Sequence, residues 1–226
     1  MATVRFRTSD GVLLEGELRE AEGTPRGTAV LCHAHPSFGG SKDHPVLWAI
    51  RNHLAARRQL TVLAFNFRGT MGSEGTHGSG AAEVADVDAA ITRVRAAVDG
   101  PTVVVGWSFG ANVALRHAVR DERVAALALV ALPLGPGAVS DLPPPPGPED
   151  LRRLPIPVLF VAGSLDRLTS VNELQALTDR IPLARFLLLP GTGHYFERRE
   201  AELAGIIGDF VGPVLRDESG APDRPQ

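Results

Sequence analysis

Short apolar runs alternate along this chain with longer amphipathic segments, and this alternation constrains the fold more than any other feature of the sequence. Such a pattern is typical of a mostly parallel sheet whose strands are joined by crossover helices. We expect eight strands, at residues 3–7, 12–19, 28–32, 61–66, 102–107, 124–131, 158–162 and 185–189. We expect helices among them at residues 44–57, 82–98, 111–120, 171–179 and 196–210.

The first two of these strands differ from the rest. They flank the turn sequence Ser9-Asp10-Gly11, which favours an antiparallel hairpin. The sequence therefore predicts an α/β fold, with a mostly parallel eight-stranded sheet and helices on both faces, in a single domain over residues 1–215. The tail at residues 216–226 has nothing apolar to bury, so we expect it to be disordered.

Residues 135–157 are rich in proline, with four consecutive prolines at 143–146. Consecutive prolines favour polyproline II structure, and they cannot donate the hydrogen bonds of a sheet. This segment is therefore predicted to be an extended excursion on the surface.

The composition limits the class of protein. Of the 226 residues, 44% are hydrophobic and 22% are charged, so the chain can bury a core of ordinary size. The formal charge of −3 and the lack of a Lys/Arg block argue against a nucleic-acid partner. The longest apolar run, at residues 124–132, is far shorter than the roughly 20 residues that cross a bilayer. Because the N-terminus also lacks the apolar core of a secretory signal, we expect a cytoplasmic protein with no membrane partner.

The motif Gly-Trp-Ser-Phe-Gly at residues 106–110 carries the strongest chemical signal in the chain. It follows the apolar sequence TVVVGW and precedes the helical sequence ANVALRHAVR, which is the strand-turn-helix context of a nucleophile elbow. Glycine is needed on both sides because a side chain there would collide with neighbouring backbone. We expect Ser108 to be a nucleophile whose hydroxyl points away from the sheet.

A serine hydroxyl needs a base, and the base needs a third group to orient it. Of the seven histidines, His194 has the best position, because the sequence PGTGHYF follows a predicted strand and so lies at the same sheet edge as Ser108. Asp166 leaves another strand in the sequence GSLDR, between Ser108 and His194. This chain order is the one expected after a nucleophile elbow. We therefore expect His194 as the base and Asp166 as the acid that orients it.

The sequence CHAHPSFGG at residues 32–40 also follows a predicted strand directly. A loop at this position supplies one backbone donor to an oxyanion hole, and the N–H of the residue after the nucleophile supplies the other. We expect Phe109 and His35 as these donors, since Pro36 has no N–H.

The same loop suggests one alternative, a metal site. His33 and His35, with Asp43 and His44 nearby, partly match a binuclear zinc signature. That signature places an Asp two residues after the second His, whereas the next Asp here is Asp43. We therefore expect neither a metal nor another cofactor. Cys32 is the single cysteine, so no internal disulfide is expected.

With these elements in order, the chain resembles the α/β-hydrolase superfamily over about residues 3–212, and within it small bacterial hydrolases that lack a lid. The resemblance rests on HAHPSFGG after the third strand and NFRGTMGSEG after the fourth, together with the elbow motif. It implies Ser108 as nucleophile, Asp166 as acid, His194 as base, and the N–H groups of His35 and Phe109 as oxyanion hole. Larger relatives carry a helical cap where this chain has residues 135–157, which leave room for a short flap at most. We therefore expect no large cap and an open site.

These observations favour a serine hydrolase that cleaves a carboxylic ester or thioester through an acyl-enzyme. Two alternatives stay open: non-hydrolytic acyl transfer or cyclisation on a biosynthetic intermediate, and a non-catalytic protein that keeps the fold to bind a ligand. The open site and the low aromatic content of 5% favour small acyl groups. The expected partner is thus a small-molecule ester or thioester, and no sequence feature fixes an oligomeric state.

Overall fold

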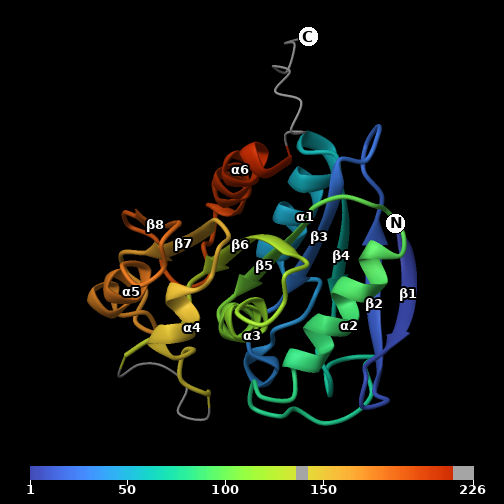
Figure 1. The fold of residues 1–226 in the computed structure, drawn as a ribbon, viewed down its shortest axis with the longest axis horizontal. Helices are drawn as coiled ribbons and strands as arrows, with labels where there is room; N and C mark the ends of the chain where they lie inside the picture. Colours follow the sequence, from blue (N-terminus) through green and yellow to red (C-terminus); the bar gives the residue numbers. More distant parts are fainter. Residues whose placement is uncertain (136–141, 216–226) are drawn as a thin grey trace.

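An eight-stranded sheet runs through the middle of the molecule in the order β1-β2-β4-β3-β5-β6-β7-β8 (Figure 1). The computed structural model describes residues 1–135 and 142–215. The pairings from β4 through β3 to β8 are parallel, whereas β2 pairs antiparallel with both β1 and β4. The strands are β1 (Ala2–Arg7), β2 (Leu13–Arg19), β3 (Gly27–Cys32), β4 (Leu60–Phe65), β5 (Thr102–Trp107), β6 (Val124–Val130), β7 (Val158–Gly163) and β8 (Ala184–Leu189).

Helices cover both faces of this sheet (Figure 1). One face carries α1 and α6, whose apolar side chains form one core cluster with the strands beneath them. The other face carries α2, α3, α4 and α5, which contribute to the second core cluster. The helices are α1 (Pro45–Arg57), α2 (Val84–Arg95), α3 (Phe109–Ala118), α4 (Pro148–Arg152), α5 (Val171–Thr178) and α6 (Glu200–Val211), with 3-10 helices η1 (Pro36–Phe38) and η2 (Gly212–Leu215).

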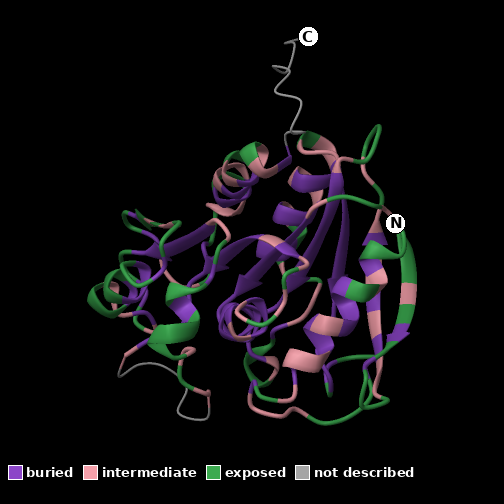
Figure 2. Cartoon of the chain, viewed as in Figure 1, coloured by how far each residue is buried: buried purple, intermediate pink, exposed green. Residues whose placement is uncertain are grey.

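The central strands are buried on both sides (Figure 2). Every residue of β3, β4, β5 and β7 is buried, as expected for parallel strands between two helical layers. The edge strand β8 is different, because Arg185, Leu187 and Leu188 are exposed. The buried strands give a rigid frame, and the loops at their carboxyl ends carry the predicted site residues.

The predicted mostly parallel sheet with helices on both faces is confirmed, and all eight strands lie close to their expected bounds. The sequence predicts that the last helix begins at Phe196, but α6 begins at Glu200. Phe196 and Arg198 both have positive φ angles, 53° and 62°, which an α-helix does not allow. The residues before α6 are therefore a loop, and this loop holds His194.

The prediction of an extended excursion at residues 135–157 is wrong in part, because α4 forms within this segment. Leu151 is fully buried and anchors α4 in the core. The preceding prolines lie on α3, where Asn112 donates to the Pro143 carbonyl at 2.9 Å and Arg116 donates to the Pro144 carbonyl at 3.0 Å. Residues 136–141 of this segment and the tail at 216–226 lie outside the described residues.

Across residues 1–135 and 142–215, every helix is too short or too polar to span a bilayer.

Candidate active site

Ser108 stands at the turn between β5 and α3, with a backbone conformation that side-chain-bearing residues rarely adopt (φ 56°, ψ −117°). Close packing surrounds this turn. A Cβ on Gly106 would lie 2.4 Å from the Gly110 carbonyl oxygen, and a Cβ on Gly110 would lie 2.3 Å from the Cys32 carbonyl oxygen. Only glycine fits at these two positions. The Ser108 N–H also donates to the Val130 carbonyl at 2.8 Å, so the turn is fastened to β6.

Ser108, His194 and Asp166 form one hydrogen-bonded chain, although they follow three different strands. His194 Nε2 lies 2.9 Å from Ser108 Oγ, and His194 Nδ1 lies 2.8 Å from Asp166 Oδ2. An ionised carboxylate can only accept, so the ring proton belongs on Nδ1 and Nε2 is left to accept from the serine hydroxyl. The structure thus brings together the three residues that the sequence predicted, in an arrangement that can deprotonate a serine.

Asp166 is suited to remain ionised. Its side chain is fully buried, and it accepts from the Leu168 N–H at 2.8 Å and from the Thr169 hydroxyl at 3.1 Å. Burial acts to raise the pKa of this carboxyl, but the hydrogen bonds from His194, Leu168 and Thr169 outweigh it and hold the pKa below its ordinary value. A negative charge therefore stands beside His194 at neutral pH.

The loops that carry Asp166 and His194 are fastened to each other. The Leu165 N–H donates to the Thr192 carbonyl at 2.9 Å, and the Gly191 N–H donates to the Ser164 hydroxyl at 2.9 Å. A Cβ on Gly163 would lie only 2.1 Å from the Thr192 carbonyl oxygen, so the two backbones are in contact. This packing fixes the spacing between the carboxylate and the imidazole.

His35 and Phe109, the predicted oxyanion donors, lie side by side with ring centroids 5.2 Å apart. The His35 loop is closed on itself: His35 Nδ1 accepts the Ser37 N–H at 3.2 Å, and the His35 carbonyl accepts the N–H groups of Phe38 and Gly40, each at 3.1 Å. Phe109 is the first residue of α3, so its N–H lies at the positive end of the helix dipole. His35 and Ser108 line the same pocket.

His33 does not offer a metal ligand. Its ring lies fully buried, with Nδ1 2.6 Å from the Ala34 carbonyl and Nε2 accepting the Phe67 N–H at 3.0 Å. Both nitrogens are therefore used by backbone groups. Burial lowers the pKa of His33 to about 4, so the ring is neutral and serves to join the loops after β3 and β4.

His77 and Glu83 form a pair that the sequence did not reveal. The His77 ring lies 4.6 Å from the His35 ring and 5.1 Å from the Phe109 ring. His77 Nδ1 is 3.0 Å from an oxygen of Glu83, which is fully buried. Glu83 also accepts two backbone N–H groups of the same loop, from Gly78 at 2.7 Å and Gly80 at 2.8 Å. This pair packs against the side of the site formed by His35 and Phe109. No local sequence motif predicts the pair, because its formation depends on the path of a glycine-rich loop.

A pocket of about 390 Å³ opens at Ser108 and His194. Its walls include residues that no sequence motif assigns to the site. These are Phe38, His44, Trp107, Leu168 and Tyr195. Only their position in the chain could have pointed to them, because each lies within a few residues of a predicted site residue or in the loop after β3.

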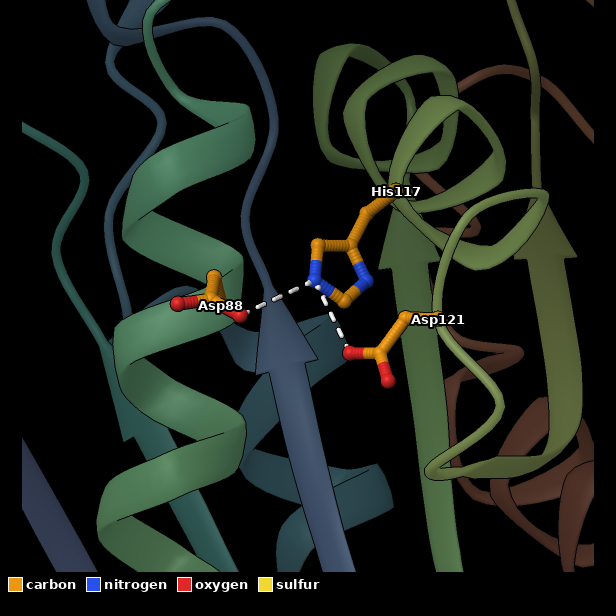
Figure 3. Close-up of side chains that lie close together, drawn as sticks. All are labelled: Asp88, His117 and Asp121. Carbon is orange, nitrogen blue, oxygen red and sulfur yellow. Dashed lines mark ion pairs between the residues drawn. The ribbon is translucent and has the colours of Figure 1, made fainter. Parts of the chain in front are cut away.

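A second polar cluster joins α2, α3 and the turn after α3 (Figure 3). His117 Nε2 lies 3.2 Å from Asp121 and 3.8 Å from Asp88. Within the part of the chain that the structure describes, these three side chains are close enough together to hold a metal ion. Arg123, however, donates to both carboxylates, at 2.6 Å to Asp121 and more closely to Asp88. The guanidinium already neutralises the oxygens that face His117. The adjoining hollow is larger, at about 550 Å³, but Ser108, His194 and Asp166 do not line it.

Several known proteins are similar to this chain in sequence or in structure. A family model described as "Alpha/beta hydrolase family" matches residues 29–149. The structure is similar to a serine hydrolase of Xanthomonas campestris described as having no lid, at 26% identity and a TM-score of 0.79, with 98% of this chain and 96% of that one covered. It is similar to an alpha-beta serine hydrolase homologue of Coxiella burnetii, also at 26% identity and a TM-score of 0.79, with 92% and 96% covered. An uncharacterized protein of Rickettsia prowazekii is 24% identical over 221 residues, or 93% of this chain and 89% of the relative.

Proposed function

The chain is a hydrolase that belongs to the alpha/beta hydrolase family, and from this premise we propose that it cleaves a carboxylic ester or thioester through a serine acyl-enzyme. The observation that carries the proposal is the hydrogen-bonded chain from Ser108 Oγ through His194 to Asp166, with contacts of 2.9 and 2.8 Å.

In the first step, Ser108 Oγ attacks the carbonyl carbon of the substrate while His194 Nε2 takes the hydroxyl proton. The carbonyl becomes a tetrahedral oxyanion. Asp166, held ionised by its hydrogen bonds, stabilises the imidazolium that forms and keeps Nδ1 protonated throughout. The imidazolium then returns its proton to the leaving alcohol or thiol as the carbon–oxygen or carbon–sulfur bond breaks.

The oxyanion needs donors that are in place before the reaction begins. The Phe109 N–H, at the N-terminus of α3, and the His35 N–H are the proposed donors. The closed loop around His35 favours this role, because its turn is held by three hydrogen bonds and does not have to reorganise. In the second half of the reaction, His194 deprotonates a water molecule, which attacks the carbonyl carbon of the Ser108 ester. The imidazolium then returns the proton to Ser108 Oγ as the bond between this oxygen and the acyl carbon breaks, and the acid is released.

The test is turnover of a panel of p-nitrophenyl esters and alkyl thioesters by the wild type, Ser108→Ala and a control, Ser9→Ala. Ser9 is exposed in the turn between β1 and β2, far along the chain from the site. Ser108→Ala is expected to lower kcat by at least about a thousandfold, and Ser9→Ala to leave it unchanged. Full turnover by folded Ser108→Ala would refute the assignment of the nucleophile.

A further inference from the structure

The pocket beside Ser108 is small and carries exposed aromatic surface. Its volume of about 390 Å³ is near the lower end of the roughly 300–1,000 Å³ that small-molecule sites occupy. Phe38 and Tyr195 line it and are 64% and 43% exposed, so part of each residue is free to contact a ligand. Leu168 adds an aliphatic contact.

One wall of the pocket is formed by the rings of His44 and Tyr195, which pack on the buried Trp107 and extend to the His194 imidazole. The rings of His44 and Tyr195 lie against Trp107, with centroid distances of 4.3 and 5.9 Å. Tyr195 also contacts the ring of His194, with a centroid distance of 5.5 Å. A substrate group that enters here meets apolar ring faces and edges close to the reacting atoms.

Within the described part of the chain, the residues that line this pocket lack permanently charged side chains. None of the described residues that line it is Lys, Arg, Asp or Glu. Burial lowers the pKa of His44, so this ring is neutral at pH 7, although Glu197 and Glu200 are close enough to oppose the shift. A carboxylate entering the pocket would lose water and gain no pairing with Lys or Arg among these lining residues.

We propose that the pocket selects a neutral, apolar group of the substrate, about the size of one aromatic ring or a short alkyl chain, and rejects a carboxylate at the same place. The inference rests on the proposed function, because it assumes that an ester carbonyl lies at Ser108. The selected group is the acyl half or the alcohol half of the ester, and the same chemistry recognises both.

Matched substrates test this selection. For the acyl half, p-nitrophenyl valerate is compared with p-nitrophenyl hemiglutarate, which has a chain of similar length ending in a carboxylate. For the alcohol half, phenyl acetate is compared with 3-carboxyphenyl acetate. Each kcat/KM is divided by the rate constant for hydrolysis of the same ester by hydroxide, which corrects for intrinsic reactivity. The corrected kcat/KM is expected to favour the neutral ester by at least about tenfold in one of the two series. That series shows whether the pocket holds the acyl half or the alcohol half.

A cation placed in the pocket should reduce the discrimination. Phe38→Lys adds one there, and Met71→Lys adds one outside the pocket lining, at a residue that is 77% exposed. Both sites are exposed, so both variants spare the core. Phe38→Lys is expected to raise the relative kcat/KM of the anionic member by at least about fivefold, while Met71→Lys leaves the ratio unchanged. Equal shifts in the two variants would mean that long-range charge, not the pocket, sets the ratio, and would overturn the inference.

Labelling by a fluorophosphonate distinguishes a failure of the proposed substrate selection from a failure of the proposed function. Each protein is treated with the probe, and the adduct is measured by intact mass. If Ser108 is labelled and the neutral and anionic substrates react equally well in both series, the substrate selection is refuted while the proposed function stands. If wild-type protein is not labelled, the proposed function fails and the selection fails with it.

Discussion

The indole Nε1 of Trp107 donates a hydrogen bond to the backbone carbonyl of His194, 3.2 Å away. Trp107 is fully buried and immediately precedes Ser108 at the end of β5. One side chain therefore ties the strand that carries the proposed nucleophile to the loop that carries the proposed base. The spacing between Ser108 and His194 is set by the core as well as by the loop.

Replacing Trp107 by Phe keeps an apolar ring but removes the donor. We expect kcat to fall by about ten- to a hundredfold, because a small displacement of His194 weakens its contact with Ser108. The free energy of unfolding should fall by about 1–3 kcal/mol, because the partly buried His194 carbonyl loses its partner and a gap opens in the core. Trp48→Phe is the control, since Trp48 is 55% exposed on α1 and should change neither quantity. An unchanged kcat in Trp107→Phe would show that the loop positions His194 without help.

Replacing Asp166 by Asn tests the proposed role of the carboxylate. The Asn amide cannot stabilise an imidazolium and can donate to Nδ1, which would favour the wrong ring tautomer. We expect kcat/KM to fall by roughly a thousand- to ten-thousandfold at neutral pH. Asp150→Asn, at an exposed position of α4, should behave as wild type. A loss of less than about tenfold in Asp166→Asn would contradict the proposed orientation of His194.

The placement of Ser108, Asp166 and His194 at one edge of the sheet could be predicted from the sequence because each signal is local. The elbow is a contiguous motif between a strand and a helix, and the other two residues directly follow apolar runs that read clearly as strands. Parallel strands deliver such residues to one sheet edge whatever the details of the loops. The hydrogen bonds of 2.8 and 2.9 Å then depend on loop packing, such as the contact of Gly163 with the Thr192 backbone, which no motif encodes.

Other features depend on partners that are distant in sequence. The contacts of Arg123 with Asp88, and of His77 with His35 and Phe109, form only once the connecting loops have folded. The helix α4 was not predicted for a different reason. The run of prolines before it favours an extended segment, although the sequence also contains a helix N-terminal signal. Pro148 stands at the first helical position and is followed by acidic residues, a common beginning for a helix.

Two glycines give opposite predictions when replaced by alanine. In Gly110→Ala the new Cβ would lie 2.3 Å from a backbone oxygen of Cys32, so the elbow must move. We expect a loss of several kcal/mol in the free energy of unfolding, or failure to fold. In Gly205→Ala the Cβ meets open space within α6, and we expect a gain of about 0.5–1 kcal/mol. Chemical denaturation measures both, and a neutral Gly110→Ala would contradict the close packing of the elbow.

The ion pair between Asp10 and Arg68 predicts a loss of stability in acid. Asp10 accepts from Arg68 at 2.8 and 3.1 Å, and these hydrogen bonds are the main reason that the pKa of Asp10 falls from 3.8 to about 2. Because the folded pKa lies below the unfolded one, the contribution of this pair is complete above about pH 4 and is lost as the pH falls towards 2. The difference in unfolding free energy between wild type and Asp10→Asn should therefore shrink between pH 6 and pH 3. A difference that stays constant or grows would show that Asp10 is not held ionised by Arg68.

Activation of Ser108 by His194 is tested most directly by fluorophosphonate labelling followed by intact-mass measurement. Wild-type protein is predicted to gain a single adduct, which maps to Ser108 and is absent from Ser108→Ala. Labelling should also slow by at least about a hundredfold in His194→Ala, because the hydroxyl then has no base. A folded wild-type protein that gains no adduct, or an adduct that persists in Ser108→Ala, would contradict the account.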